Sequence, residues 1–272
     1  MQDVERSARA TDTQIIDLLT SAVREAGLLA LRKFRTPFKS WTKGGSSPVS
    51  EIDIEVDVLL RQRLAAYDSR YGWLSEETAD SPARLDVERV WIVDPIDGTR
   101  GFIAGMPDWT VVAALVESGR PIHAAVYAPV DDQLFLASAG QGAPLNGAPI
   151  AASAGDALAG ARVNGAKRRA EALASLVPGI EIIPRLNSLA LRLARVAEGR
   201  FDIVFSAGNS HDWDLAASDL LVHEAGGVLT DADGRELVYN RADPVHGALI
   251  AAGQARHAVL LELVRANRAK FA

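Results

Sequence analysis

The strongest structural signal in this chain is the segment Arg89-Val90-Trp91-Ile92-Val93-Asp94-Pro95-Ile96-Asp97-Gly98-Thr99. Its apolar first half predicts a short buried β-strand. Because proline restricts the residue before it to extended backbone, Asp94-Pro95 predicts the end of this strand and a turn. Asp97 returns three residues after Asp94, so both carboxylates can face one point.

This pair of carboxylates has the chemistry of a magnesium site. Mg²⁺ binds oxygen ligands, commonly one or two carboxylates together with waters and substrate oxygens. The turn also makes the carbonyl of Ile96 available as a ligand. Gly98 and Thr99 follow where a turn or short helix can begin, and N–H groups at a helix start bind phosphate oxygens. The alternative interpretation is that Asp97-Gly98 is turn chemistry only.

Two further acidic positions lie at comparable places in the predicted fold. Glu76, in Ser75-Glu76-Glu77-Thr78, follows a predicted strand over residues 71–74, and Asp214 lies in the first turn of a helix predicted over residues 213–225. Each alone has a simpler explanation, a solvated loop for Glu76 and a favourable helix-dipole interaction for Asp214. Three acidic clusters at strand ends or helix starts together indicate one metal site.

The remaining pattern predicts a layered α+β or α/β sandwich. A helix is expected from a cap at Thr11-Asp12 to about Phe34, followed by a flexible loop at Lys43-Gly44-Gly45-Ser46-Ser47-Pro48. Ser50 is expected to start a second helix that carries Asp53. Further strands are expected at residues 110–116, 122–127, 133–137, 201–205, 228–230 and 248–252, and further helices at residues 188–198 and 256–267.

The Pro- and Gly-rich stretch over residues 140–149 is the expected boundary between two halves. Residues 1–142 form an N-terminal α+β half with most of the metal ligands. Residues 143–272 form a C-terminal α/β half that supplies Asp214.

Composition argues against several classes of protein function. The 272-residue chain has a formal net charge of −6, which argues against nucleic acid as a partner but allows a small anion bound through a metal. It has no cysteine, so thiolate nucleophiles and thiolate metal sites are excluded. Residues 1–12 lack the apolar core of a signal peptide, and no segment predicts a membrane span, so a cytoplasmic protein is expected.

Three motifs carry a family resemblance. They are Ser75-Glu76-Glu77-Thr78, the segment from Trp91 through Thr99, and Trp213-Asp214-Leu215-Ala216-Ala217 followed by Glu224-Ala225-Gly226-Gly227. Their order and spacing resemble the inositol monophosphatase family, within the superfamily of lithium-sensitive, magnesium-dependent phosphatases. The resemblance implies an αβαβα sandwich, inhibition by Li⁺ and a homodimer. It departs from the family at Ser75, where glycine is usual.

The resemblance also implies a role for each site residue. Asp53 and Thr99 resemble the pair that orients and deprotonates the attacking water, with Glu76 as a further catalytic residue. Gly98 and Thr99 would grip the phosphate, and Arg100 and Asp214 would contact substrate. The implied ligands of two or three Mg²⁺ ions are Glu76, Asp94, the carbonyl of Ile96, Asp97 and Asp214.

The implied activity is hydrolysis of a small phosphorylated metabolite by a metal-activated water. The favoured substrate is 3′-phosphoadenosine 5′-phosphate, converted to AMP, because residues 110–129 look most like the bisphosphate nucleotidase branch. Arg185 and Arg192 could meet a second phosphate, or could be solvated surface residues.

Alternatives remain open at this point. Inositol 1-phosphate is disfavoured because Ala207 stands where inositol-specific members usually carry an acid. Histidinol phosphate is an alternative because residues 101–109 resemble that branch. His211 could contact substrate or have a structural role. A regulatory scaffold that retains the fold is the alternative from another class.

Overall fold

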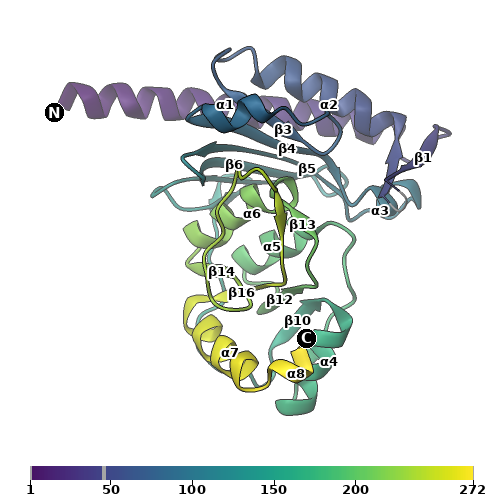
Figure 1. Ribbon diagram of the computed structural model, residues 1–272, viewed down its shortest axis with the longest axis vertical. Helices are drawn as coiled ribbons and strands as arrows, with labels where there is room; N and C mark the ends of the chain where they lie inside the picture. Colours follow the sequence, from purple (N-terminus) through teal and green to yellow (C-terminus); the bar gives the residue numbers. More distant parts are fainter. Residues whose placement is uncertain (1, 45–46, 272) are drawn as a thin grey trace.

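The computed structural model describes residues 2–44 and 47–271, and within them the chain forms five layers (Figure 1). Helices α1 (Gln2–Lys33) and α2 (Glu51–Leu64) cover one face of a seven-stranded sheet. Helices α5 (Leu189–Ala197) and α6 (Asp212–Glu224) pack on its other face and separate it from a five-stranded sheet. Beyond that sheet lie α4 (Lys167–Leu176), α7 (Gln254–Ala266) and α8 (Arg268–Phe271). The predicted αβαβα sandwich is confirmed.

The seven-stranded sheet has the order β3-β4-β5-β6-β7-β8-β9, and only the β3–β4 pair is parallel. Its strands are β3 (Gly72–Ser75), β4 (Arg89–Asp97), β5 (Thr110–Glu117), β6 (Arg120–Ala128), β7 (Gln133–Ser138), β8 (Pro144–Leu145) and β9 (Ala148–Pro149).

The five-stranded sheet is mixed and has the order β11-β10-β12-β16-β14. Its strands are β10 (Arg162–Gly165), β11 (Glu181–Ile182), β12 (Ile203–Ser206), β14 (Gly227–Asp231) and β16 (Leu249–Gly253). The smaller elements are the pair β1 (Ser40–Lys43) and β2 (Ser47–Ser50), the pair β13 (Ser210–His211) and β15 (Val245–His246), a 3₁₀ helix η1 (Pro82–Asp86) and α3 (Thr99–Ile103).

Apolar side chains point to both faces of β4, which explains why this strand lies between two helical layers. Val90 and Ile92 point into the core shared with α5 and α6. Trp91 and Val93 point into the core shared with α1 and α2. Successive side chains of a strand face opposite sides, so an unbroken apolar run is what a strand buried on both faces requires. The C-terminal end of the same strand carries Asp94 and Asp97.

The start of α2 follows the prediction closely. Ser50 caps the helix, and its hydroxyl accepts hydrogen bonds from the amides of Ile52 and Asp53. The carboxylate of Asp53 in turn accepts from the amide of Ser50, at 2.8 Å. This reciprocal arrangement is a capping box, and it fixes the position of Asp53 through the backbone.

Three predicted boundaries are wrong. The first helix begins at Gln2, not at a cap at Thr11-Asp12, because residues 3–10 contain no glycine or proline to interrupt it. Strand β4 does not stop at Asp94; a register shift between Asp94 and Asp97 accommodates Pro95, which has no N–H to donate. The loop predicted around Lys43 instead contains strands β1 and β2, which pair from Ser40↔Ser50 to Lys43↔Ser47. Gly45 and Ser46 of that loop lie outside the described residues.

The other predicted helices and strands are present within a few residues of their expected limits. The division at residue 142 stays a prediction. Among the described residues, no helix combines the length and apolar character needed to cross a membrane.

Candidate active site

A cleft of about 710 Å³ gathers side chains from elements far apart in the sequence. Its acidic side is formed by Glu76 after β3, Asp94 and Asp97 in β4, and Asp214 at the start of α6. These are the four acids that the motifs predict as metal ligands. The structure therefore brings all four predicted carboxylates to one cleft.

Three of these carboxylates form a tight group. Asp94, Asp97 and Asp214 each offer an oxygen, and these atoms all lie within 4.8 Å of one another. Oδ1 of Asp94 is buried and has no hydrogen-bond partner. A buried acceptor without a partner is costly unless something positive meets it. Oxygen ligands in this arrangement fit a hard divalent cation.

Hydrogen bonds within the chain hold one carboxylate oxygen of Asp97 and one of Asp214 in place. Oδ2 of Asp97 accepts from the Ser188 hydroxyl at 2.5 Å and from the Ala190 amide at 2.6 Å, both at the start of α5. Oδ2 of Asp214 accepts from the His211 amide at 2.6 Å. One oxygen of each carboxylate is thus used for anchoring, which leaves the other for a ligand.

Burial and mutual repulsion disturb the titration of these acids. Burial, reinforced by the neighbouring carboxylates of Glu76 and Asp97, raises the pKa of Asp94 well above its usual range. The pKa of Asp214 is raised well above its usual range, first by burial and then by Asp97. Burial raises the pKa of Glu76 to about 7, although Lys43 opposes the rise. A cation among these groups would favour their ionised forms.

A pH-dependent stability follows for the metal-free protein. Because the pKa of Glu76 is higher in the folded chain (about 7) than its ordinary value of 4.5, this group stabilises the fold below pH 4.5, and that contribution is lost as pH rises through 7. The difference corresponds to about 3 kcal/mol. We therefore expect Glu76→Gln to raise the free energy of unfolding in EDTA at pH 8 but not at pH 4.5, measured by urea denaturation. An equal effect at both pH values would contradict this electrostatic explanation.

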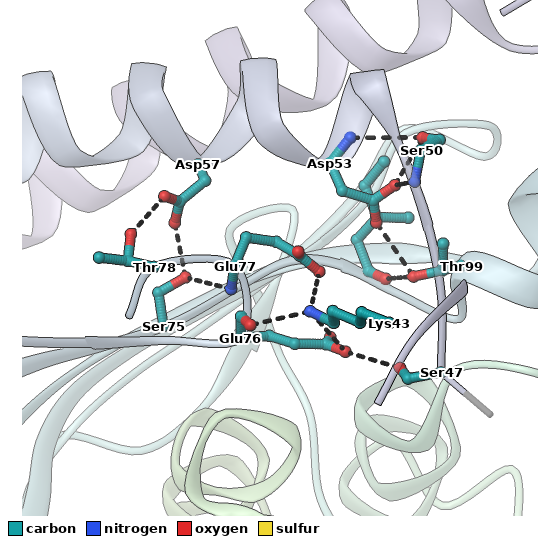
Figure 2. Close-up of polar contacts among 11 residues, drawn as sticks. Lys43, Ser47, Ser50, Asp53, Asp57, Ser75, Glu76, Glu77, Thr78 and Thr99 are labelled. Atoms are coloured by element: carbon teal, nitrogen blue, oxygen red, sulfur yellow. Dashed lines mark hydrogen bonds and ion pairs between the residues drawn. The ribbon is translucent and has the colours of Figure 1, made fainter. Parts of the chain in front are cut away.

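Lys43 extends from the β1–β2 hairpin to the acidic loop, Ser75-Glu76-Glu77-Thr78 (Figure 2). Its ammonium donates to Oε1 of Glu77 at 2.7 Å and to the carbonyl of Glu76 at 2.9 Å, and it lies 3.5 Å from Oε1 of Glu76. The Ser47 hydroxyl donates to the same Oε1 at 3.4 Å. Sequence reasoning missed Lys43 because it assigned this segment to a loop. No local signal was available, because the partners of Lys43 lie 33 and 34 residues further along the chain.

Asp53 and Thr99 meet from positions 46 residues apart. The Thr99 hydroxyl lies 3.0 Å from Oδ1 of Asp53 and 2.9 Å from the carbonyl of Ile96, and it can donate to either oxygen (Figure 2). Burial raises the pKa of Asp53, although hydrogen bonds from Ser50 and Thr99 oppose the rise. A buried carboxylate paired with a hydroxyl at the cleft wall has the arrangement of a proton acceptor.

Gly98 joins the end of β4 that carries Asp94 and Asp97 to α3. Its φ of +96° lies in the left-handed region that favours glycine. A Cβ there would also lie 3.1 Å from the Ser188 amide nitrogen and 3.3 Å from the Asp108 carbonyl oxygen. Gly98, Thr99 and Arg100 all line the cleft, as the motif predicts.

The cleft is also lined by basic residues, and the charge of Arg192 interacts with those of Asp97 and Asp214. Arg192 is buried, and burial together with the nearby Arg185 lowers its pKa to about 10. In the described part of the chain, no carboxylate lies within ion-pair distance of Arg192 or Arg185. Because Arg192 is buried, its interpretation as a solvated surface residue is wrong, whereas Arg185 is exposed and lines the cleft. The five basic residues that line the cleft are Arg100, Lys167, Arg168, Arg185 and Arg192.

Four further positions bear on the sequence interpretation. Sequence analysis missed Lys167 and Arg168, although the run Lys167-Arg168-Arg169 was a visible basic signal. Ala207 lies exposed in the cleft lining and presents no carboxylate there. His211 is not among the lining residues; its ring stacks on Trp213 with centroids 4.5 Å apart, which favours the structural role.

Comparison with known proteins agrees with the site geometry. The family model described as the inositol monophosphatase family matches residues 11–269. An inositol-1-monophosphatase of Rhizobium meliloti (strain 1021) is 34% identical over 81% of this chain and 86% of its own length. The Nus factor SuhB of Escherichia coli (strain K12) is 32% identical over the same shares. Among solved structures, the suhB protein of Bartonella henselae superposes with a TM-score of 0.81 at 27% identity, covering 93% of this chain and 99% of that one.

Proposed function

This chain belongs to the inositol monophosphatase family of metal-dependent phosphatases, and on that premise we propose that it is a Mg²⁺-dependent phosphomonoesterase. The observation that carries the proposal is the group of Asp94, Asp97 and Asp214 within 4.8 Å, with a buried oxygen of Asp94 that lacks a partner. Thr99 lines the same cleft, and Asp53 lies buried behind it, hydrogen bonded to the Thr99 hydroxyl. A cation site beside a proton acceptor is what hydrolysis of a phosphate monoester requires.

The proposed cation ligands come from three separate segments of the chain, namely the loop after β3, strand β4 and the start of α6. They are Glu76, Asp94, the carbonyl of Ile96, Asp97 and Asp214. Mg²⁺ bound by these residues supplies Lewis-acid stabilisation of phosphate charge and activation of water. Ile96 still has capacity for a ligand, because its carbonyl has two lone pairs and accepts from one side chain, Thr99.

The chain's own groups then bind the phosphate and move the proton. The amides of Gly98 and Thr99, at the start of α3, bind phosphate oxygens. The Thr99 hydroxyl accepts the proton of the attacking water and passes its own proton to Oδ1 of Asp53, to which it is already hydrogen bonded. The raised pKa of Asp53 makes this carboxylate a better proton acceptor than an exposed aspartate.

The proposed substrate is a doubly phosphorylated nucleotide, 3′-phosphoadenosine 5′-phosphate, hydrolysed to AMP. The support is the set of arginines in the cleft lining, which includes the buried Arg192, since arginine binds phosphate oxygens bidentately. One phosphate would bind at Gly98 and Thr99 beside the proposed cation ligands, and the other would meet the arginines of the lining. Ala207 provides no acceptor for an inositol hydroxyl.

A substrate panel tests this assignment. Phosphate release should be measured with Mg²⁺ for 3′-phosphoadenosine 5′-phosphate, inositol 1-phosphate and histidinol phosphate. We expect the first to exceed the others at least about a hundredfold in kcat/KM, which corresponds to about 2.7 kcal/mol of transition-state discrimination. A preference for inositol 1-phosphate would overturn the substrate and favour the activity named for the R. meliloti relative.

A second candidate function has one supporting observation. The E. coli relative is named as a Nus factor, so a regulatory role that retains the fold is the alternative. Hydrolysis of none of the three esters in the presence of Mg²⁺ would make this role the leading one.

Arg185 provides a separate test of the second phosphate. We expect Arg185→Gln to lower kcat/KM for 3′-phosphoadenosine 5′-phosphate roughly tenfold to a hundredfold, since a hydrogen bond to a charged group contributes about 1.5–3 kcal/mol. Inositol 1-phosphate, with one phosphate, should change less than about threefold on the same reasoning. Arg200→Gln is the control, because Arg200 is exposed and does not line the cleft. Equal losses on both substrates would contradict the assignment of Arg185 to a second phosphate.

A further inference from the structure

Asp57 is a buried carboxylate that does not line the cleft yet lies next to the acidic loop. Its side chain comes from α2, one turn after Asp53. Oδ1 accepts from the Ser75 hydroxyl at 2.5 Å, and Oδ2 accepts from the Thr78 hydroxyl at 2.6 Å (Figure 2). Both carboxylate oxygens are therefore engaged by hydroxyls that flank Glu76.

These contacts fix both ends of a four-residue loop. Ser75 is the last residue of β3, and Thr78 lies three residues further on. The Ser75 oxygen also accepts from the amide of Glu77 at 3.3 Å, so the same network reaches the middle of the loop. Ser75 is the position at which the motif departs from the usual glycine. Its hydroxyl is used here as the link between Asp57 and the loop.

The helix that carries Asp57 is itself firmly placed. The capping box at Ser50 fixes its first turn, and Val56 and Leu60 are fully buried between α1 and the sheet. Asp53 and Asp57 thus share one rigid turn. The same turn positions the proton acceptor through Asp53 and the loop of Glu76 through Asp57.

Lys43 contacts the other side of this loop but does not replace these bonds. It binds the carboxylate of Glu77 and the carbonyl of Glu76, and its hairpin, β1 and β2, is only two strands wide. A two-stranded ribbon has little stability of its own. The Glu76 amide donates to the Val93 carbonyl at 3.4 Å, which ties the start of the loop to β4, and the side-chain contacts of the loop to the rigid helix run through Asp57.

We propose that Asp57 is a positioning residue that sets the divalent-metal affinity of the site by holding Ser75 and Thr78, and with them Glu76, in the ligating position. The inference rests on the proposed function, because it requires Glu76 to be a metal ligand. Without these bonds the loop must be ordered when the metal binds, which lowers affinity. Once the metal is bound, the chemistry is unchanged, so affinity is affected much more than turnover.

Direct metal binding tests this role with matched variants. Binding of Mn²⁺ to the full chain should be measured from the electron paramagnetic resonance signal of the free ion. We expect Asp57→Asn and Thr78→Val to weaken binding roughly tenfold to a hundredfold, the usual effect of removing a residue that orients a ligand. Thr78→Ser keeps the hydroxyl and should stay within about threefold of the wild type, and kcat at saturating Mg²⁺ should change by less than about threefold in all variants.

A double variant and a control separate positioning from general destabilisation. Asp57→Asn combined with Thr78→Val should weaken binding no more than the stronger single change, because both remove one network. Asp202→Asn also removes a buried acid, one paired with Arg162 away from the cleft, and should lower thermal stability without changing Mn²⁺ binding. Circular dichroism checks that each variant is folded. If Asp57→Asn does not fold, the comparison of Thr78→Val with Thr78→Ser still tests the positioning role.

The possible outcomes distinguish failure of the proposed function from failure of the positioning role of Asp57. Wild-type protein that binds no Mn²⁺ would overturn the proposed function and this inference with it. Wild-type binding with equal affinity in Thr78→Val and Thr78→Ser would overturn the positioning role alone. A fall in kcat as large as the fall in affinity would also overturn it, because Asp57 would then act on the chemistry.

Discussion

Replacing Asp94 with asparagine is expected to lower kcat/KM about a thousandfold and to raise the melting temperature of the metal-free protein. Asp94 lies in the tight carboxylate group and carries the buried oxygen without a partner. Loss of one ligand removes several kcal/mol of charge stabilisation in the transition state, and about 4 kcal/mol corresponds to about a thousandfold. The opposite effect on stability arises because asparagine removes one charge from a cluster whose members repel one another.

The two effects are measured on the same preparation. Phosphate release is followed with saturating Mg²⁺, and thermal unfolding is followed in EDTA at pH 8. Asp131→Asn is the control for the chemical change, because Asp131 is exposed in the turn between β6 and β7. Activity retained by Asp94→Asn, or a lower melting temperature without metal, would contradict the ligand assignment.

Replacing Thr99 with valine is expected to lower kcat about a hundredfold to ten-thousandfold, the range for loss of general base assistance. Valine has nearly the shape of threonine but no hydroxyl to link the attacking water to Oδ1 of Asp53. The variant should keep its Mn²⁺ affinity, because the proposed carboxylate ligands are unchanged. Steady-state kinetics and Mn²⁺ binding together check this pattern.

Thr99→Ser is the matched comparison, since it retains the hydroxyl at the same position. We expect it to keep most of the activity that Thr99→Val loses. If serine and valine variants were equally impaired, the methyl group would be the important part of Thr99, and the proton path through Asp53 would be wrong.

Features that depend on neighbouring residues were predictable from the sequence. The capping box of Ser50 and Asp53 spans four residues, and the return of Asp97 toward Asp94 spans four as well. Asp214 at the start of α6 likewise follows from local signals. The prediction that these segments meet rested on the family resemblance and on the position of each motif at a strand end or helix start, and the observed cleft agrees with that prediction.

Features that depend on distant partners were not predictable. Asp97 is held by Ser188, 91 residues away, and the Thr78 hydroxyl is held by Asp57, 21 residues away on another element. Lys43 was missed because its partners, Glu76 and Glu77, lie more than 30 residues along the chain. Hydrogen bonds of this kind follow from packing of layers, and hydrophobic periodicity does not contain that information.

The most direct test of the account is phosphate release from 3′-phosphoadenosine 5′-phosphate as Mg²⁺ is titrated into protein freed of metal with EDTA. The account predicts no turnover without metal, saturable activation by Mg²⁺, and no activation of the Asp94→Asn variant over the same range. Equal turnover in EDTA and in Mg²⁺ would contradict the claim that the carboxylates of Asp94, Asp97 and Asp214 form a catalytic metal site.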